Sequence, residues 1–244
     1  MPAGQNYIIL EIGSARQLGS RNAASKFTAQ PLLDFEKQGW EAGALRIAGV
    51  DEAGRGPLAG PVCAAAVVFD SDFLVDLAES SLKAITDSKQ LSEKRREELY
   101  QLLTSNSHIE YGIALVESAD IDRLNILAAT SVAMARALGK IAPPPDLALV
   151  DGNLVQGLPC PAKFIVKGDA KSLSIAAASI IAKVHRDRIM VAMDREYPQY
   201  GFAAHKGYGT PEHLDAIKKH GATPQHRRTF KPVREVLDPP WDFQ

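Results

Sequence analysis

The 244-residue sequence is poor in cysteine, in net charge and in long apolar runs, and each scarcity excludes a class of protein. Its two cysteines, Cys63 and Cys160, form no disulfide framework, and no CxxC or Cys/His cluster indicates zinc. No apolar run approaches the roughly 18–20 residues of a membrane span. A GxSxG motif is absent and neither cysteine neighbours a histidine, so no protein nucleophile is indicated. We expect a cytoplasmic protein.

The formal net charge of −1 does not by itself indicate a nucleic-acid partner. Basic residues nevertheless gather between His205 and Arg234, where only Glu212 and Asp215 oppose them. The basic residues of this segment are Lys206, Lys218, Lys219, Arg227, Arg228, Lys231 and Arg234. Such a segment can neutralise phosphates, although a solvated helix face would have the same composition.

The stretch IAGVDEAGRGPLAGP, residues 47–61, carries most of the chemistry. An apolar run typical of a buried strand leads to Asp51 and Glu52, and a Gly-Arg-Gly turn follows at once. Acids at a strand end beside bare backbone amides can hold a metal and a phosphate together. Two other interpretations are a solvated surface turn and a dinucleotide-binding loop. The second is disfavoured because the glycines lead into another apolar run, and because two carboxylates would repel a pyrophosphate.

The pattern of apolar strand, acid and nearby glycine occurs twice more, with Asp151 after residues 147–150 and Asp169 after residues 164–166. In open α/β sheets, ligands gather just outside the strand ends. We expect four carboxylates to converge there: Asp51, Glu52, Asp151 and Asp169. Oxygen ligands without His or Cys suit Mg²⁺ or Mn²⁺. Because neighbours on a regular strand face opposite sides, we also expect the first strand to end or bulge at Glu52.

Residues 172–193 are rich in alanine and good helix formers, which predicts a long helix with a narrow face packed on the sheet. Asp187 lies near the end of this segment and is a tempting fifth carboxylate. We assign it a structural role instead, paired with Arg186 and Arg188. A short amphipathic helix is also predicted over residues 31–40, docking on the body of the protein.

Tyr208 lies between two glycines and next to a lysine. A tyrosine in such a loop can lay its flat ring on a sugar or a base. A core tyrosine is the alternative, but the flanking glycines make a tightly packed position a poorer interpretation. Thr210 and Pro211 then predict the N-cap and first residue of a helix that runs to about His220.

Five ordered blocks resemble the ribonuclease HII (type 2 RNase H) family in its bacterial form, with matching spacing across about residues 46–235. The blocks are DEAGRGPLAGP at 51–61, DSKQL at 87–91, VDGN at 150–153, KGDAKSLSIAAASIIAKVHRDR at 167–188 and HKGYGT at 205–210. The resemblance implies an α/β protein with an RNase H-like fold, in which helices flank a mixed five-stranded sheet. We expect residues 1–30 to form a poorly ordered extension and residues 31–244 a single catalytic domain. Its core would span about 45–197, followed by a helical C-terminal region over about 198–244.

The resemblance also implies an activity, a metal-dependent endonuclease that hydrolyses the RNA strand of RNA–DNA hybrids. Such enzymes also cut 5′ to single ribonucleotides embedded in duplex DNA, and leave 3′-hydroxyl and 5′-phosphate ends. By resemblance, the four acids bind two divalent cations, Mg²⁺ or Mn²⁺, and are the catalytic residues. The implied substrate-binding residues are Gly54, Arg55, Gly56, Lys89 and Tyr208. The expected partner is an RNA–DNA hybrid or a ribonucleotide-containing DNA duplex, bound by a monomer.

Two rivals remain open at the level of sequence. The chain could bind hybrid duplexes without cutting them, with the acids serving folding. It could also be a nuclease of the same superfold that acts on plain DNA, in which case the Gly-Arg-Gly loop would not sense a 2′-hydroxyl.

Overall fold

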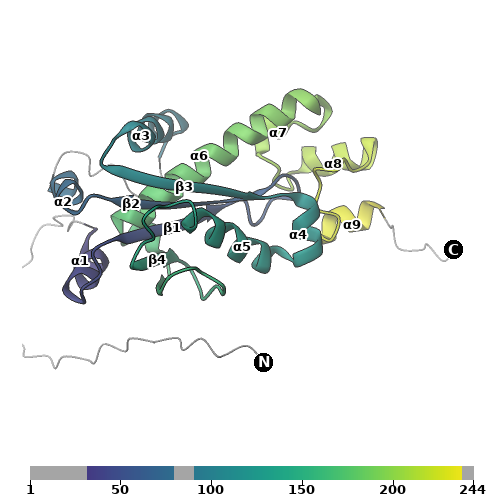
Figure 1. Ribbon diagram of the computed structural model, residues 1–244. Helices are drawn as coiled ribbons and strands as arrows, with labels where there is room; N and C mark the ends of the chain where they lie inside the picture. Colours follow the sequence, from purple (N-terminus) through teal and green to yellow (C-terminus); the bar gives the residue numbers. More distant parts are fainter. Residues whose placement is uncertain (1–31, 80–90, 238–244) are drawn as a thin grey trace, which may run out of the picture.

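The computed structural model describes residues 32–79 and 91–237, which form a mixed five-stranded sheet with helices on both faces (Figure 1). The strand order is β3-β2-β1-β4-β5. The strands are β1 (Ile47–Ala53), β2 (Val62–Phe69), β3 (Ile109–Val116), β4 (Leu147–Asp151) and β5 (Ala162–Ile165). The first three pair antiparallel, whereas β4 and β5 run parallel to β1. This confirms the predicted α/β fold class.

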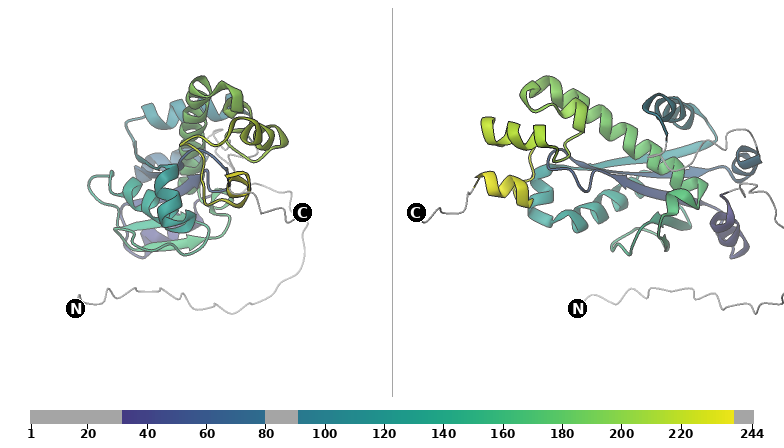
Figure 2. Two further views of the ribbon diagram at one scale, coloured as in Figure 1. Left: turned by 90° about the vertical axis from the view of Figure 1, so that its right-hand side faces the viewer. Right: turned by 180° about the vertical axis from the view of Figure 1, so that it is seen from behind.

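The helices cover the two faces of the sheet and one of its ends (Figures 1 and 2). α6 packs on β1 and β2 together with α3, and α5 packs on the opposite face of the same strands. The α-helices are α1 (Asp34–Glu41), α2 (Ser71–Glu79), α3 (Glu93–Ser105), α4 (Ser118–Leu124), α5 (Ile126–Leu138), α6 (Leu173–Glu196), α7 (Phe202–His205), α8 (Pro211–His220) and α9 (Lys231–Leu237). Two short 3₁₀ helices are η1 (Gly168–Ala170) and η2 (Pro198–Tyr200).

Small residues let α6 lie very close to the central strands. Every residue of β2 is buried, and its side chains alternate between the α6 face, which includes Ala65, and the α5 face, which includes Ala64. A Cβ added to Gly49 of β1 would lie 2.0 Å from the carbonyl carbon of Ser174. The backbone of α6 therefore contacts β1 directly, as the alanine-rich sequence predicts.

The start of α6 is fixed by the buried carboxylate of Glu36 in α1. Its Oε1 accepts hydrogen bonds from the Ser172 hydroxyl at 2.6 Å and from the Ser174 N–H at 3.1 Å. Burial raises the pKa of Glu36, and these bonds oppose that shift. The predicted docking helix is thus present, beginning at Asp34, and it holds α6 beside η1.

The last helices gather at the end of the sheet toward which the β1–β2 hairpin points (Figure 1). Thr210 caps α8 by accepting a hydrogen bond from the His213 N–H, and Pro211 is the first helical residue, as predicted. A separate apolar cluster, which includes Leu58 and Phe202, joins these helices to the loop after β1. Within the described part of the chain, no helix combines the length and apolar character required to cross a bilayer.

Candidate active site

Parallel pairing brings Asp51 and Asp151 to the same edge of the sheet. Val50 of β1 lies opposite Val150 of β4, and each valine is followed directly by an aspartate. Asp151 is the last residue of β4, where β5 pairs with it through Ile165. Two strand ends therefore deliver carboxylates side by side, as the repeated sequence pattern predicts.

Asp51 is a buried carboxylate that faces α6, with only 4% of its surface exposed. It accepts hydrogen bonds from the Ser179 hydroxyl and, at 2.7 Å, from the Glu52 N–H. Burial, together with the carboxylates of Glu52 and Asp151, nevertheless raises the pKa of Asp51 well above its usual value. The cost of keeping Asp51 ionised therefore comes from desolvation and from its acidic neighbours.

The expectation that β1 ends or bulges at Glu52 is wrong. Glu52 pairs with Ala64 and Ala53 pairs with Cys63, so the strand continues in regular register. The physical reason is that β2 still pairs with β1 beyond Val50, where the pairing with β4 ends. Glu52 consequently starts from the opposite face to Asp51, yet its carboxylate is close enough to raise the pKa of Asp51.

Asp169 lies beside Asp151 because of a tight turn after β5. The Gly168 N–H donates a hydrogen bond of 2.5 Å to Oδ1 of Asp151, and Asp169 is the next residue in η1. Lys167 adopts a left-handed conformation with φ of 57°, which reverses the chain there. Asp169 is buried at 5% exposure. One backbone N–H thus orients Asp151 and holds the segment that carries Asp169.

The donor set fits a hard divalent cation, although its geometry is not yet that of a metal cage. Among residues 32–79 and 91–237, no three His, Cys, Asp or Glu side chains are already arranged to hold one metal ion. All four candidate ligands are carboxylates, which is the donor type that Mg²⁺ and Mn²⁺ favour. The raised pKa of Asp51 reflects burial first and then the carboxylates of Glu52 and Asp151, whose negative charge a cation would offset.

The loop between β1 and β2 is held by hydrogen bonds from the buried guanidinium of Arg227. It donates hydrogen bonds to the carbonyls of Gly54 at 2.6 Å, Arg55 at 2.9 Å and Gly60 at 2.8 and 3.0 Å. Burial, and then the neighbouring Arg186, lower the pKa of Arg227 to about 9, so it stays protonated at pH 7. Arg227 therefore serves the loop backbone, which corrects its assignment as a phosphate-neutralising surface residue.

Arg186 of α6 joins this loop to the segment that carries Tyr208. Its guanidinium donates to the carbonyls of Ala59 at 3.1 Å, Pro61 at 2.9 Å and Lys206 at 3.0 Å. A Cβ added to Gly54, whose φ is +93°, would lie 2.0 Å from the Arg186 Nε. The guanidinium groups of Arg186 and Arg227 therefore lie directly against this loop. At position 54 only glycine, which has no side chain, leaves room for Arg186 at this distance.

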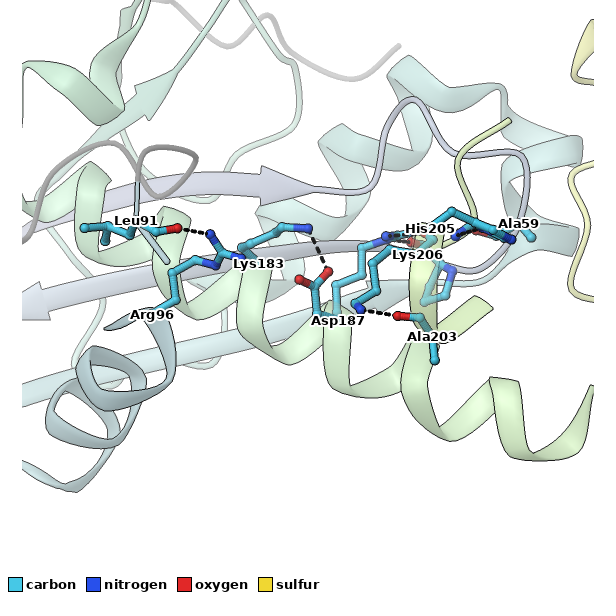
Figure 3. Close-up of polar contacts among 11 residues, drawn as sticks. Ala59, Leu91, Arg96, Lys183, Asp187, Ala203, His205 and Lys206 are labelled. Carbon is cyan, nitrogen blue, oxygen red and sulfur yellow. Dashed lines mark hydrogen bonds and ion pairs between the residues drawn. The ribbon is translucent and has the colours of Figure 1, made fainter. Parts of the chain in front are cut away.

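The expectation that Asp187 pairs with Arg186 and Arg188 is wrong. The carboxylate of Asp187 accepts a hydrogen bond of 2.8 Å from Lys183 one turn earlier (Figure 3). Arg188 instead pairs with Glu97 and lies 4.3 Å from the ring centroid of Tyr100. Side chains at 186, 187 and 188 point in different directions around a helix, which separates Asp187 from both arginines.

The substrate-binding residues predicted from sequence fall into three groups. Tyr208 is 47% exposed, and a Cβ added to Gly56 would lie 3.5 Å from its Cε1, so the ring lies beside the Gly-Arg-Gly loop. Arg55 points toward the acids and bonds to Glu52 at 3.1 Å. Lys89 lies outside the described residues.

Sequence reasoning missed the buried arginines, although α6 carries a signal for one of them. Arg186 follows Ala182 and precedes Met190 by four residues each, and both neighbours are buried. This spacing places Arg186 on the buried face of the helix. Arg227 lies in an irregular basic segment, where no period distinguishes a buried arginine from an exposed one.

Comparison with known proteins identifies relatives over most of the chain. Residues 48–233 match a family model described as Ribonuclease HII. A protein named Ribonuclease HII from Geobacillus kaustophilus is 50% identical over 222 residues, covering 91% of this chain and 82% of that protein.

Solved structures show the same fold. The ribonuclease H2 of Pyrococcus horikoshii superposes with a TM-score of 0.67 at 30% identity, covering 78% of this chain and 96% of that one. Bst-RNase HIII, crystallised in complex with Mn²⁺, has a TM-score of 0.62 at 17% identity, covering 90% of this chain and 75% of that one. The latter likeness concerns the fold alone.

Proposed function

The chain belongs to the ribonuclease HII family of nucleases, and we propose that it hydrolyses the RNA strand of RNA–DNA hybrids and cuts 5′ to single ribonucleotides in duplex DNA. The proposed products carry 3′-hydroxyl and 5′-phosphate ends. This activity would serve the removal of ribonucleotides from DNA and of RNA primers. We propose that residues 31–244 act as one domain, because Arg227 of the C-terminal region holds the β1–β2 loop.

One juxtaposition carries the proposal. The β1–β2 hairpin presents Asp51 and Glu52 on its first strand, and three residues later begins the loop that lies beside the Tyr208 ring. A nucleotide lying across this hairpin would meet carboxylates at one end and an exposed aromatic ring at the other. Metal-assisted hydrolysis and recognition of the sugar are therefore possible on the same nucleotide step.

The proposed metal ligands are Asp51, Glu52, Asp151 and Asp169, and the proposed cofactors are two Mg²⁺ or Mn²⁺ ions. Bound divalent ions would supply Lewis-acid activation of water and stabilisation of the leaving oxygen. The carboxylate oxygens of these residues are the donor type that both ions favour, which supports this cofactor class. Here the chain itself orients Asp51 through Ser179 and the Glu52 N–H, and orients Asp151 through the Gly168 N–H.

The chain's remaining groups would select the substrate. Backbone groups of Gly54, Arg55 and Gly56 can approach a 2′-hydroxyl closely, since Gly56 offers no side chain to obstruct it. Tyr208 would stack on the nucleotide sugar at the junction between RNA and DNA. Lys89 is proposed by resemblance to touch a substrate phosphate. The monomeric state and the cytoplasmic location remain predictions from sequence.

The test is a cleavage assay on three matched duplexes: one with a single ribonucleotide, one RNA–DNA hybrid and one all-DNA control. Each is incubated with Mg²⁺, with Mn²⁺ and with chelator, and the cut is mapped at nucleotide resolution. We expect metal-dependent cleavage immediately 5′ to the ribonucleotide, cleavage of the hybrid and an intact control. Extension of the upstream product by a polymerase and ligation of the downstream product identify the 3′-hydroxyl and 5′-phosphate ends.

Two results would contradict the proposal and identify its rivals. Cleavage of the all-DNA duplex at a similar rate would indicate a nuclease that does not sense the 2′-hydroxyl. Tight binding of the hybrid by folded protein, with no cleavage under either metal, would indicate a binding module.

A further inference from the structure

Three histidines lie beneath the loop that carries Tyr208. His213 of α8 and His226 of the following loop are buried, at 0% and 1% exposure, and their Nε2 atoms are 3.1 Å apart. The ring of His205 stacks on that of His213 with 4.5 Å between centroids. Phe202 packs edge-on against His213. These rings occupy the interior between α7, α8 and the loop, away from the acids.

The hydrogen bonds fix which nitrogen of each ring carries the proton. The Thr223 backbone N–H can only donate, so the Nδ1 of His226 accepts at 2.9 Å and its Nε2 carries the proton. That proton is donated to the Nε2 of His213. His213 then carries its own proton on Nδ1, which donates to the Tyr208 carbonyl at 2.8 Å. Burial lowers the pKa of both histidines to about 4, so the rings are neutral at pH 7.

The result is a directed relay from Thr223 through His226 and His213 to the backbone of Tyr208. His205 holds the other side of the same loop, because its Nδ1 accepts from the Gly207 N–H at 3.1 Å and its carbonyl accepts from the Tyr208 N–H at 3.0 Å. The Leu58 N–H also donates to the Gly207 carbonyl at 2.7 Å. The exposed Tyr208 ring therefore extends from a backbone segment whose N–H and carbonyl groups are hydrogen-bonded to His205, His213 and Leu58.

We propose that His213 is a positioning residue, which sets the Tyr208 ring against the substrate through the hydrogen bond from its Nδ1 to the Tyr208 carbonyl. This inference rests on the proposed function, in which the Tyr208 ring contacts the nucleotide. Preorganisation of a binding group matters because a small displacement lowers the rate without changing the chemistry. His213 itself touches no substrate.

A pair of polar variants isolates this hydrogen bond. In His213→Asn the side-chain amide reaches the place of Nδ1 and can still donate to the Tyr208 carbonyl. In His213→Gln the side-chain amide reaches the place of Nε2 instead, so it cannot donate to the Tyr208 carbonyl. We expect H213N to keep kcat/KM on the single-ribonucleotide duplex within about 2-fold of wild type, and H213Q to lose about 10-fold, the size of one lost hydrogen bond.

The control for general loosening of α8 is Ile217→Val, which removes one buried methylene from the same helix without touching the relay. The decisive comparison repeats H213Q in a Tyr208→Ala background. If His213 acts through Tyr208, H213Q causes no further loss there. A loss of the same size in both backgrounds, or equal losses for H213N and H213Q, would overturn the proposal.

Nitrogen chemical shifts of the imidazoles test the relay without any activity. Two-dimensional proton–nitrogen spectra of the full chain at pH 7 should show the Nδ1–H tautomer for His213 and the Nε2–H tautomer for His226. The Nε2–H tautomer for His213 would overturn the inference even if cleavage proceeds as proposed. Conversely, correct tautomers with no cleavage by wild type would contradict the proposed function and leave the relay standing.

Discussion

The carboxylates at the strand ends and the loops beside them are held in opposite ways. Burial, and then the neighbouring acids Glu52 and Asp151, raise the pKa of Asp51, and no three potential ligands within residues 32–79 and 91–237 are arranged around one ion. The loops at 54–60 and 205–210 instead have their backbone carbonyls held by Arg186, Arg227 and His213. The carboxylates of the acidic region repel one another, whereas the backbone carbonyls of the two loops already have hydrogen-bond donors within the protein.

This difference suggests a division of labour. If the proposed cations draw Asp51, Glu52, Asp151 and Asp169 into one ligand set, the order of this acidic region should depend on metal. The loop region, which we call the recognition platform and define as residues 54–60 and 205–210, should keep its shape without metal. Four changes test this division, from the largest expected effect to the smallest.

Asp151→Asn should abolish turnover, because it removes the charge of a proposed metal ligand, while its amide oxygen can still accept the hydrogen bond from the Gly168 N–H. Loss of several kcal/mol of charge stabilisation corresponds to a fall in kcat on the order of 1,000-fold. The measurement is kcat with saturating Mg²⁺, beside a urea unfolding curve. Asp187→Asn is the matched control, since this acid bonds to Lys183 outside the site. A near-normal rate for D151N would remove Asp151 from the acidic region.

Arg227→Met should destabilise the protein through the recognition platform. The change keeps the length of the side chain but leaves the carbonyls of Gly54, Arg55 and Gly60 without their buried donor. We expect a loss of about 3 kcal/mol in the free energy of unfolding. Urea denaturation with and without Mg²⁺ measures it, and Arg228→Met, at the exposed neighbouring position, should change stability by less than about 0.5 kcal/mol. Equal stabilities of R227M and R228M would contradict the role of Arg227 in holding the loop between β1 and β2.

Acid should weaken the support of the platform through His213, which donates to the Tyr208 carbonyl, and through His226, which contacts His213. The pKa of His213 and of His226 is about 4 in the folded protein, below the ordinary value of 6.5, so the unfolded chain takes up protons first as the pH falls. Stability is therefore fully present above pH 6.5 and is lost between about pH 6.5 and 4. Each histidine adds a slope of up to about 1.4 kcal/mol per pH unit.

Urea unfolding of wild type and His226→Gln across this pH range isolates that slope from the titration of the acids. The variant should lose less stability per pH unit than wild type. Parallel curves would show that His226 does not contribute to the acid sensitivity.

Tyr208→Ala has the smallest expected effect, confined to substrate use. The ring is 47% exposed, so the free energy of unfolding should stay within about 0.5 kcal/mol of wild type. We expect kcat/KM on a single-ribonucleotide duplex to fall about 10-fold, since stacking on one nucleotide is worth about 1–3 kcal/mol. Steady-state kinetics on that duplex, with Tyr208→Phe as the control that keeps the ring, measure it. Unchanged kinetics for Y208A would exclude a role for the ring.

Much of the fold was accessible from sequence because it depends on local patterns. Apolar runs predict the strands that deliver Asp51 and Asp151, and the alanine-rich segment predicts the close approach of α6 to Gly49. Thr210 caps helix α8 where the capping pattern places it. Each of these features is determined by residues that are close together in the chain.

The parts that sequence reasoning missed depend on contacts between distant segments. Arg227 lies 173 positions from Gly54, to which it donates a hydrogen bond, and the His213–His226 contact requires α8 to fold back on the next loop. The expectation that β1 ends or bulges at Glu52 was also wrong, because the length of the pairing between β1 and β2 determines where β1 ends. Because His226 and Arg227 lie in an irregular segment, no local pattern reports that their side chains will be buried.

The most direct test of the division of labour is a binding measurement in chelator. Dissociation constants of wild-type protein are determined by fluorescence anisotropy for a duplex with one ribonucleotide and for its all-DNA counterpart, with no free divalent ions. A platform that the protein holds by itself predicts that the ribonucleotide duplex binds about 10-fold more tightly, although nothing is cut. Equal dissociation constants for the two duplexes would show that recognition of the ribonucleotide requires metal, which would contradict a platform that the protein holds by itself.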